Sequence, residues 1–291
     1  MVSLAVVNQK GGVGKTTLVL GLASVAAAAG RRVVVVDLDP QANATSGLGV
    51  WNPPQTVDRA LEADQPGILA ELAVDSGWDH PVAHRVRVVA SSPRLAQREP
   101  QLATDPIGAQ DRLRIAMEGI DEVADVVLID CPPSLGLLTV NGLFAADRAA
   151  IVTEPAAWAT DGVEQILRNV SRIAERRSGL PAVAGIVVNR LARTRDARYW
   201  DDQLVEAHGA RVVRPPVRLR AAMAEASAQS LPIHALTRDG AAEAVAELEL
   251  VEAVLFERPA PAPAPTVDLT AVDDREPVLA APGVAPSHGG L

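Results

Sequence analysis

The segment Val6–Thr17, VVNQKGGVGKTT, constrains the fold more than any other stretch of this chain. An apolar run at Leu4–Val7 enters it and predicts a strand, and residues 18–29, interrupted by a single glycine, predict a helix after it. A glycine-rich turn between a strand and a helix presents backbone N–H groups at the helix N-terminus. The segment therefore predicts a phosphate-binding site.

Two lysines set this loop apart from the usual phosphate-binding pattern, in which a glycine and four further residues precede Gly-Lys-Ser/Thr. Gly14, Lys15 and Thr16 match the end of the pattern, but Gln9 occupies the first glycine position and Lys10 follows it. The 27 basic residues of the chain include only these two lysines, and all others are arginine. This exception to the arginine bias indicates that the loop requires a compact ammonium group.

The residue types in the loop predict a nucleotide site with a magnesium ion. We expect Lys15 to bridge the β- and γ-phosphates and the Thr16 hydroxyl to bind Mg²⁺. The glycines let the backbone approach the phosphates without a clash from Cβ. The predicted nucleotide-binding residues of the loop are Gly11, Gly12, Val13, Gly14, Lys15, Thr16 and Thr17.

Carboxylates follow two apolar runs that predict buried parallel strands. One run leads into Asp37 and Asp39, which would face the same side of a continuing strand, and the other leads into Asp130. Ligands in open α/β sheets bind at the carboxyl ends of the strands. We therefore expect Asp39 to orient the attacking water, unless it only caps the following turn. The predicted metal ligands are Thr16, Asp37 and Asp130.

Strands and helices alternate along the chain, which predicts an α/β fold with a doubly wound, mostly parallel sheet flanked by helices. The predicted strands beyond the first are residues 33–36, 85–90, 125–130, 149–153, 183–188 and 211–213. The predicted later helices are residues 56–73, 110–123, 161–177, 200–208, 221–229 and 240–256, and residues 41–49 are predicted to form a polar loop.

The composition changes at Pro259 to a stretch rich in proline, alanine and acidic residues. Such a stretch buries too little apolar surface to offset the entropy of ordering it. We therefore predict one phosphate-loop domain over residues 1–257 and a disordered tail over residues 258–291.

Composition also limits the possible settings of the protein. The single cysteine, Cys131, excludes an intrachain disulfide framework. The N-terminus starts on a strand without a visible signal peptide, and no apolar run approaches the ~20 residues of a membrane span. We therefore expect a cytoplasmic protein. A formal charge of −9 argues against a wholly basic nucleic-acid binder but permits a local basic patch.

Three stretches, Lys10–Thr17, Asp37–Gly49 and Leu128–Asn141, occur in the order found in the ParA/Soj partition ATPases and resemble their motifs. This family belongs to the deviant Walker A group of phosphate-loop NTPases, which also contains MinD. The resemblance covers residues 1–256. It implies ATP and Mg²⁺ as cofactors and a slow ATPase whose hydrolysis is stimulated by a partner.

The resemblance also implies roles for particular residues. Lys10 would reach across a nucleotide-sandwich homodimer to the phosphates of the other copy, which explains the second lysine of the loop. Lys10, Lys15 and Asp39 would then be the catalytic residues. Asn189, which follows an apolar strand, would bind the adenine.

Members of the family bind double-stranded DNA non-specifically as ATP dimers, and a centromere-bound ParB-type partner stimulates hydrolysis and release. Residues 181–220 contain eight arginines and four acidic residues, which is a local basic patch. The candidate DNA-binding residues are Arg190, Arg193, Arg195, Arg218 and Arg220. This reading predicts a nucleoid-associated protein. In the alternative, the arginines form a solvated face with i, i+4 pairs to aspartate and glutamate.

Three other functions are alternatives to a partition ATPase. A MinD-like protein that marks a membrane site needs a basic amphipathic helix, which the acidic tail does not offer, so no membrane partner is predicted. An iron–sulfur carrier needs cluster cysteines, and Cys131 beside the metal aspartate is badly placed for that purpose. An orphan ParA-like protein that positions another cargo is an open alternative.

Overall fold

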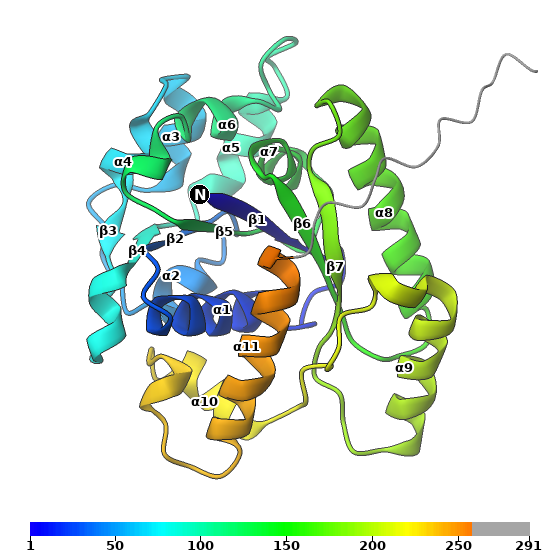
Figure 1. The fold of residues 1–291 in the computed structure, drawn as a ribbon. Helices are drawn as coiled ribbons and strands as arrows, with labels where there is room; N and C mark the ends of the chain where they lie inside the picture. Colours follow the sequence, from blue (N-terminus) through cyan, green and yellow to red (C-terminus); the bar gives the residue numbers. More distant parts are fainter. Residues whose placement is uncertain (258–291) are drawn as a thin grey trace, which may run out of the picture. The chain divides into compact units, whose positions relative to one another are not determined.

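A mostly parallel sheet forms the centre of the part of the chain that the computed structural model describes, residues 1–257 (Figure 1). Within these residues the sheet has seven strands in the order β3-β4-β2-β5-β1-β6-β7. The strands are β1 (Val2–Val7), β2 (Val33–Asp37), β3 (Val74–Asp75), β4 (Val86–Val89), β5 (Val126–Asp130), β6 (Arg148–Thr153) and β7 (Ala182–Val188). All neighbours pair in parallel except β3 with β4. The predicted fold class is confirmed, and the predicted tail lies outside the described residues.

The register of the central strands brings their carboxyl ends to one edge of the sheet. Asp37 at the end of β2 pairs with Asp130 at the end of β5, and Val6 of β1 pairs with Asp130 on its other side. The four valines of β2 are buried on both faces, as expected for a central parallel strand. The two aspartates and the loop after β1 therefore meet at the same place.

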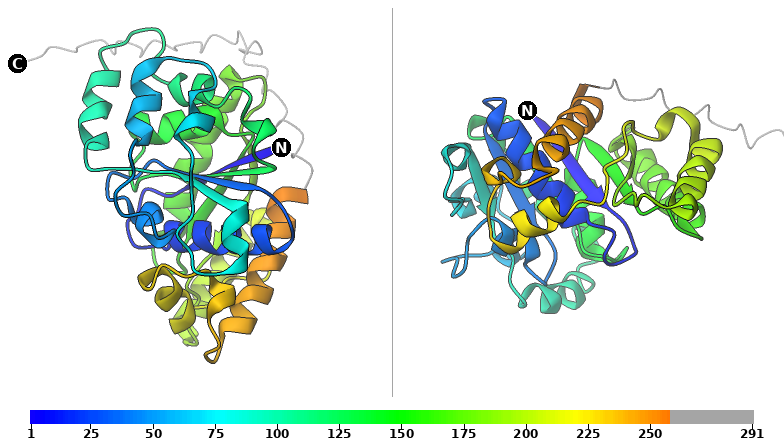
Figure 2. Two further views of the ribbon diagram at one scale, coloured as in Figure 1. Left: turned by 90° about the vertical axis from the view of Figure 1, so that its left-hand side faces the viewer. Right: turned by 90° about the horizontal axis from the view of Figure 1, so that it is seen from below.

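Helices cover both faces of the sheet (Figures 1 and 2). One face packs against α1 (Lys15–Ala28), α2 (Asn43–Gly47), α10 (Ala221–Ala228) and α11 (Ala241–Glu257). The other face packs against α3 (Val57–Ala63), α4 (Ile68–Leu72), α5 (Leu95–Leu102), α6 (Arg112–Ala116), α7 (Leu137–Ala145), α8 (Ala159–Arg176) and α9 (Arg195–His208). Among the described residues, no helix combines the length and the apolar character that a membrane crossing requires.

Helix α1 packs against the sheet and against α11, and these contacts hold the loop in front of it. A Cβ atom on Gly21 would lie 2.8 Å from Leu248 Cδ1, so the two helices approach closely at this glycine. Protein interiors are close-packed, and an added methyl group here would push α11 away from α1. The helix that starts at the phosphate site is therefore fixed along its length.

Two predicted helices are interrupted in the structure. Residues 56–73 form α3 and α4, because the chain turns at Pro66–Gly67, where Gly67 has a φ of 78°. The missing N–H of proline and the left-handed glycine both end a helix. Residues 110–123 likewise divide into α6 and a short 3-10 helix, Ile120–Glu122, after Gly119 with a φ of 74°.

Other local predictions were wrong. Residues 211–213 do not form a strand: a 3-10 helix at Gly209–Arg211 ends there, and Val212 makes only an isolated bridge to Ile186. The polar loop predicted over residues 41–49 contains α2, which carries little apolar periodicity. Helix α5 was not predicted, because it contains a proline and few apolar residues.

Candidate nucleotide site

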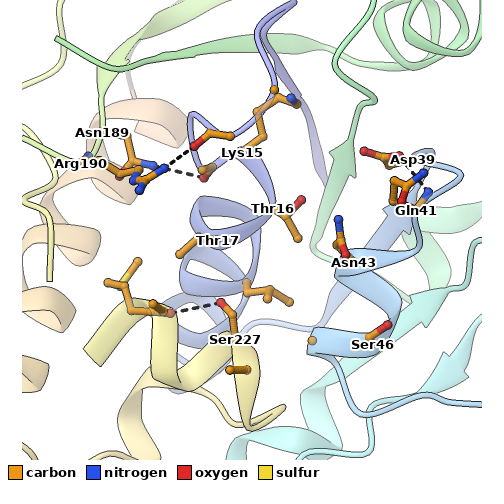
Figure 3. A pocket seen from close by; sticks show the side chains of 18 of the residues that line it. Lys15, Thr16, Thr17, Asp39, Gln41, Asn43, Ser46, Asn189, Arg190 and Ser227 are labelled. Carbon is orange, nitrogen blue, oxygen red and sulfur yellow. Dashed lines mark hydrogen bonds between the residues drawn. The ribbon is translucent and has the colours of Figure 1, made fainter. Parts of the chain in front are cut away.

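A pocket of about 700 Å³ opens at the loop between β1 and α1, residues 8–14, which we call the phosphate loop (Figure 3). Its wall comes from this loop, from the first turn of α1, from the residues after β2 and β7, and from α10. The volume lies within the usual range for small-molecule sites. The pocket therefore unites segments that lie far apart in the sequence.

The phosphate loop ends at Gly14, which has a φ of 84° and caps α1. A Cβ atom at this position would lie 2.4 Å from Asn189 Nδ2, so both the conformation and the space require glycine. The predicted residues Gly11, Gly12, Gly14, Lys15, Thr16 and Thr17 line the pocket, whereas Val13 is buried behind the loop.

Lys15 begins α1 and is only 6% exposed. Burial lowers the pKa of its ammonium group, while the nearby charges of Asp130, Cys131 and Asp39 raise it. An ammonium group that lacks water and lies at a helix N-terminus is suited to an anionic ligand. Figure 3 shows Lys15 above Thr16 and Thr17 at the start of α1.

The Thr16 hydroxyl donates a hydrogen bond of 2.7 Å to Asp130 Oδ2, which joins two of the predicted metal ligands. Asp130 is fully buried, and its second oxygen, Oδ1, has no hydrogen-bond partner among the described residues. Burial, followed by the charge of Asp37, raises the Asp130 pKa to about 8, against the opposing effects of Thr16 and Lys15. A buried oxygen without a partner beside a hydroxyl fits a magnesium ion, which prefers oxygen ligands.

The third predicted metal ligand, Asp37, is already engaged within the chain. Its Oδ2 atom accepts hydrogen bonds from Thr45 N at 2.8 Å and from Thr45 Oγ1 at 2.7 Å, and its Oδ1 accepts one from Asp39 N. Burial raises the Asp37 pKa to about 6. In this structure Asp37 organises the segment after β2, and its contact with a metal stays a prediction.

Asp39 lines the pocket, but not for the geometric reason expected. Strand β2 ends at Asp37, so the two aspartates do not continue one strand. Asp39 lies on the following loop, where its Oδ1 accepts from Gln41 N at 2.9 Å and its carbonyl oxygen accepts from Ser91 Oγ. Gln41 and Asn43 lie beside it (Figure 3). A carboxylate at the pocket wall can orient a water molecule, and this role stays a prediction.

Asn189 and Arg190 follow β7, line the pocket and contact the backbone of the phosphate loop. The Asn189 amide is 3% exposed and donates to the carbonyl oxygens of Val13 at 2.9 Å and Gly14 at 3.2 Å. The Arg190 guanidinium donates to the carbonyl oxygen of Gly12. Figure 3 shows both residues beside the loop. Adenine binding by Asn189 and DNA binding by Arg190 stay predictions.

The two lysines of the loop have opposite surroundings. The side chain of Lys10 is 64% exposed, and Lys10 does not line the pocket that contains Lys15. Its Nζ atom lies 4.0 Å from Glu154 Oε2, and its backbone N–H donates to Asn8 Oδ1 at 2.7 Å. Lys15 therefore faces the site of its own chain, whereas Lys10 faces solvent.

The other candidate DNA-binding arginines lie in two different environments. Arg218 and Arg220 line the pocket, and both pair with Glu247, Arg220 at 2.6 Å and Arg218 at 3.5 Å. Arg193 and Arg195 are exposed and form no ion pair within residues 1–257. The carboxylates thus come from distant elements and not from the same helix, and they neutralise only part of the patch.

Four residues of this site were missed from the sequence: Asn8, Thr45, Glu154 and Glu247. Glu154 carries the same signal as Asp130, a carboxylate directly after an apolar strand, and it pairs with Arg190 at 2.9 Å. Glu247 lies inside a helix, where no sequence signal distinguishes it from a solvent-exposed glutamate.

Comparisons with known proteins place these features in context. A family model described as an AAA domain matches residues 1–180. The sporulation initiation inhibitor protein Soj of Bacillus subtilis is 37% identical over 196 residues, which are 66% of this chain and 74% of that protein. The chromosome-partitioning ATPase Soj of Thermus thermophilus is 35% identical over 241 residues, which are 82% of this chain and 90% of that protein.

Solved structures share the fold. Cobyrinic acid a,c-diamide synthase from Mycobacterium smegmatis, solved with a bound ATP analog and magnesium, has a TM-score of 0.72 and 29% identity, covering 90% of this chain and 98% of that chain. Apo McdA from Cyanothece has a TM-score of 0.74 and 19% identity, covering 86% and 99%. The Pyrococcus furiosus cell division ATPase MinD has a TM-score of 0.66 and 24% identity, covering 86% of this chain and 98% of that chain. At these identities the last two show the fold alone.

Proposed function

The chain belongs to the ParA/Soj family of partition ATPases, and from this premise we propose that it hydrolyses ATP to control its own dimerisation and its binding to DNA. ATP and Mg²⁺ are its cofactors. In the ATP state two copies enclose the nucleotides between them, and the dimer binds nucleoid DNA. A ParB-type partner stimulates the slow hydrolysis that releases it.

The contrast between Lys10 and Lys15 carries this proposal. A lysine that serves the nucleotide of its own chain belongs inside the pocket, as Lys15 does. Lys10 belongs to the same loop but is exposed and outside the pocket lining. A second copy facing this edge of the sheet would supply the phosphate that Lys10 lacks in its own chain. This arrangement supports the cross-dimer role that the family implies.

The residues in the pocket have complementary parts in hydrolysis. Lys15 and the N–H groups at the start of α1 bind and orient the phosphates. Thr16 and Asp130 would hold magnesium, which would supply positive charge to the phosphate groups. Asp39 holds the attacking water in line with the γ-phosphate, and Lys10 of the other copy adds positive charge there.

The free arginines support a DNA surface at the start of α9. Arg193, Arg195 and Arg198 are exposed there and form no ion pair within residues 1–257. Arg218 and Arg220 are neutralised by Glu247 and would have to leave it before they bind a phosphate. Binding through three free arginines should weaken steeply with salt, because each phosphate contact releases counterions.

Dimerisation tests the proposal most directly. With Mg²⁺ and a non-hydrolysable ATP analogue, the wild-type protein should form dimers in light scattering, and with ADP it should be a monomer. Lys10→Ala should stay monomeric while it still binds the analogue. Arg176→Ala, on the exposed end of α8, is the control and should dimerise normally. An intact Lys10→Ala dimer contradicts the cross-dimer role.

DNA binding needs a separate measurement. The ATP-state dimer should bind a random duplex, and changing Arg193 and Arg195 together to alanine should lower the log–log salt slope by about 2 per copy. The ATPase rate should rise when DNA and the product of the adjacent reading frame are added together. Absence of both effects would contradict the partition function.

A second candidate, which the sequence leaves open, is that the same ATP switch positions another cargo or marks a membrane site. Sedimentation of the ATP-state protein with anionic vesicles and with DNA distinguishes the two candidates. Co-sedimentation with vesicles but not with DNA would favour a membrane site. ATP-dependent DNA binding without stimulation by the ParB-type protein would favour another cargo.

A further inference from the structure

Three consecutive carbonyl groups of the phosphate loop are bound by the two residues that follow β7, which also line the pocket, and the Gly14 oxygen accepts the first helical bond from Leu18 N as well. Asn189 Nδ2 donates to the carbonyl oxygens of Val13 and Gly14, and the Arg190 guanidinium donates to that of Gly12. The backbone N–H groups of Val13, Gly14 and Lys15 donate to no other group within residues 1–257. The carbonyl groups of the loop are therefore held in place, while the N–H groups that follow them have no partner within residues 1–257.

The planarity of the peptide bond connects these two facts. In a trans peptide the carbonyl of one residue and the N–H of the next point in opposite directions. Three carbonyls held by the residues after β7 thus direct the next three N–H groups away from Asn189 and Arg190. Successive N–H groups that converge in this way form a concave site for an anion. The positive φ values of Gly12 and Gly14 permit this path.

The two clamping side chains are themselves fixed. Arg190 Nη1 lies 2.9 Å from Glu154 Oε1, which follows β6. Asn189 donates its backbone N–H to the Thr153 carbonyl oxygen at 2.8 Å, and its Oδ1 accepts the N–H of Arg190 at 2.9 Å. Arg190 has a φ of 57°, a costly conformation for an arginine that its surroundings must hold in place. The clamp is thus built from the ends of two neighbouring strands.

We propose that Asn189 and Arg190, anchored by Glu154, are positioning residues that hold the phosphate loop in its phosphate-binding shape before a nucleotide arrives. This inference rests on the proposed function, because it concerns the same ATP site. It gives Arg190 a role at the nucleotide in place of a DNA contact. It also gives the Asn189 amide a role at the loop backbone in place of adenine recognition.

The test compares Arg190→Ala with a matched control, Arg32→Ala. Arg32 also joins a carboxylate, Asp125, to backbone carbonyl oxygens, but it lies at the opposite ends of the strands. In fluorescence titrations with Mg²⁺, Arg190→Ala should raise the Kd of both ATP and ADP about tenfold, as expected for the loss of one organising charged hydrogen bond. Arg32→Ala should change neither Kd more than about twofold.

Kinetics separate positioning from general damage. Arg190→Ala should raise KM with little change in kcat at saturating ATP, because the reacting groups are intact once the nucleotide fills the loop. Arg190→Lys should restore part of the affinity, since its ammonium group can still donate to Glu154 or the loop. If Arg190→Ala does not fold, Glu154→Gln provides a second variant, for which a several-fold rise in Kd is expected.

Two measurements discriminate against the competing roles. The ratio of ATP to GTP affinity should be unchanged in Asn189→Ala, whereas a loss of this ratio would overturn the clamp in favour of adenine recognition. At saturating ATP, the salt slope of DNA binding by Arg190→Ala should equal that of the wild type, and a decrease of about 1 would assign Arg190 to DNA. Wild-type Kd values in Arg190→Ala and Glu154→Gln would also overturn the clamp. A wild-type protein that binds no nucleotide would instead refute the proposed function.

Discussion

Strand β5 has an aspartate at each end, and the two differ in almost every respect. Asp125, just before the strand, accepts four hydrogen bonds from Arg32, through its backbone N–H and its guanidinium. These bonds lower its pKa to about 2. Asp130, at the other end, is fully buried with one oxygen unpartnered, and burial raises its pKa to about 8.

The difference shows that the carboxyl end of β5, and not its amino end, carries the ionisable group that is available to a ligand. Asp125 has a partner for each oxygen and lies partly in solvent, so it stabilises the chain in any state of ligation. Asp130 lacks such a partner, and the surrounding core supports the cost of burying it. Lys15 lies at the same end and is also buried. Ionisable groups with shifted pKa values that gather at or just beneath a pocket indicate a site for a charged ligand.

The largest expected effect comes from exchanging the two carboxylates for amides. Asp130→Asn should lower magnesium-dependent phosphate release at least ~100-fold, because an amide does not supply an anionic oxygen to the metal. Asp125→Asn should keep turnover within about twofold, since it touches only Arg32. Equal losses in both variants, or normal turnover in Asp130→Asn, would contradict the different roles assigned to Asp130 and Asp125.

Asp39→Ala tests a second carboxylate at the edge of the sheet where β2 and β5 end. We expect turnover to fall about 10²- to 10⁴-fold, the range for loss of a group that positions or activates a reactant. ATP binding and ATP-dependent DNA retention should persist, because Lys15, Thr16 and Asp130 are untouched. Gel-shift and phosphate-release assays on the same preparation measure both properties. If this variant hydrolyses ATP at the normal rate, Asp39 does not orient the water.

The sequence predicts which residues lie near this site better than it predicts which of them contact one another. Lys15, Thr16 and Asp130 could be assigned because each follows from a strand end or a helix start, which are local signals. Asn189 could be placed at a strand end, but its contact with Val13 and Gly14 depends on the order of the strands in the sheet. Alternation of strands and helices does not determine that order. The pairing of Glu154 with Arg190 depends on the same strand order.

The errors in the fold have two different causes, one local and one tertiary. The helix predicted over residues 56–73 breaks at Pro66–Gly67, a signal that was present in the sequence and was outweighed by the apolar pattern around it. The segment 211–213 has strand-like residues and lies beside the edge strand β7, but Val212 makes only an isolated bridge there. Tertiary position, not propensity, decided its conformation.

Arg32→Ala tests the amino end for stability, where a smaller effect is expected. Its guanidinium donates to the carbonyl oxygens of Asp121 and Glu122 as well as to Asp125, so its loss should loosen the entrance of β2 and β5. Because the pair is exposed, we expect a fall in Tm of only about 2–4 °C. Calorimetry without nucleotide measures it. A fall of similar size in Arg190→Ala without loss of ATP affinity would erase the distinction between the two ends.

The smallest effect is the acid sensitivity that Asp125 contributes, and its sign is opposite to that of Asp130. The folded-state pKa of Asp125 is lowered to about 2, so its stabilisation is present above the unfolded value of ~3.9 and is lost as pH falls from about 4 to 2. The stability gap between wild type and Asp125→Asn should therefore close over this range in urea titrations. The Asp130 pKa is raised to about 8, so the charged form opposes folding, and metal-free wild type should lose stability relative to Asp130→Asn as pH rises from about 4 to 8. Parallel pH dependence in the two variants would contradict the assignment of opposite roles to the two ends of β5.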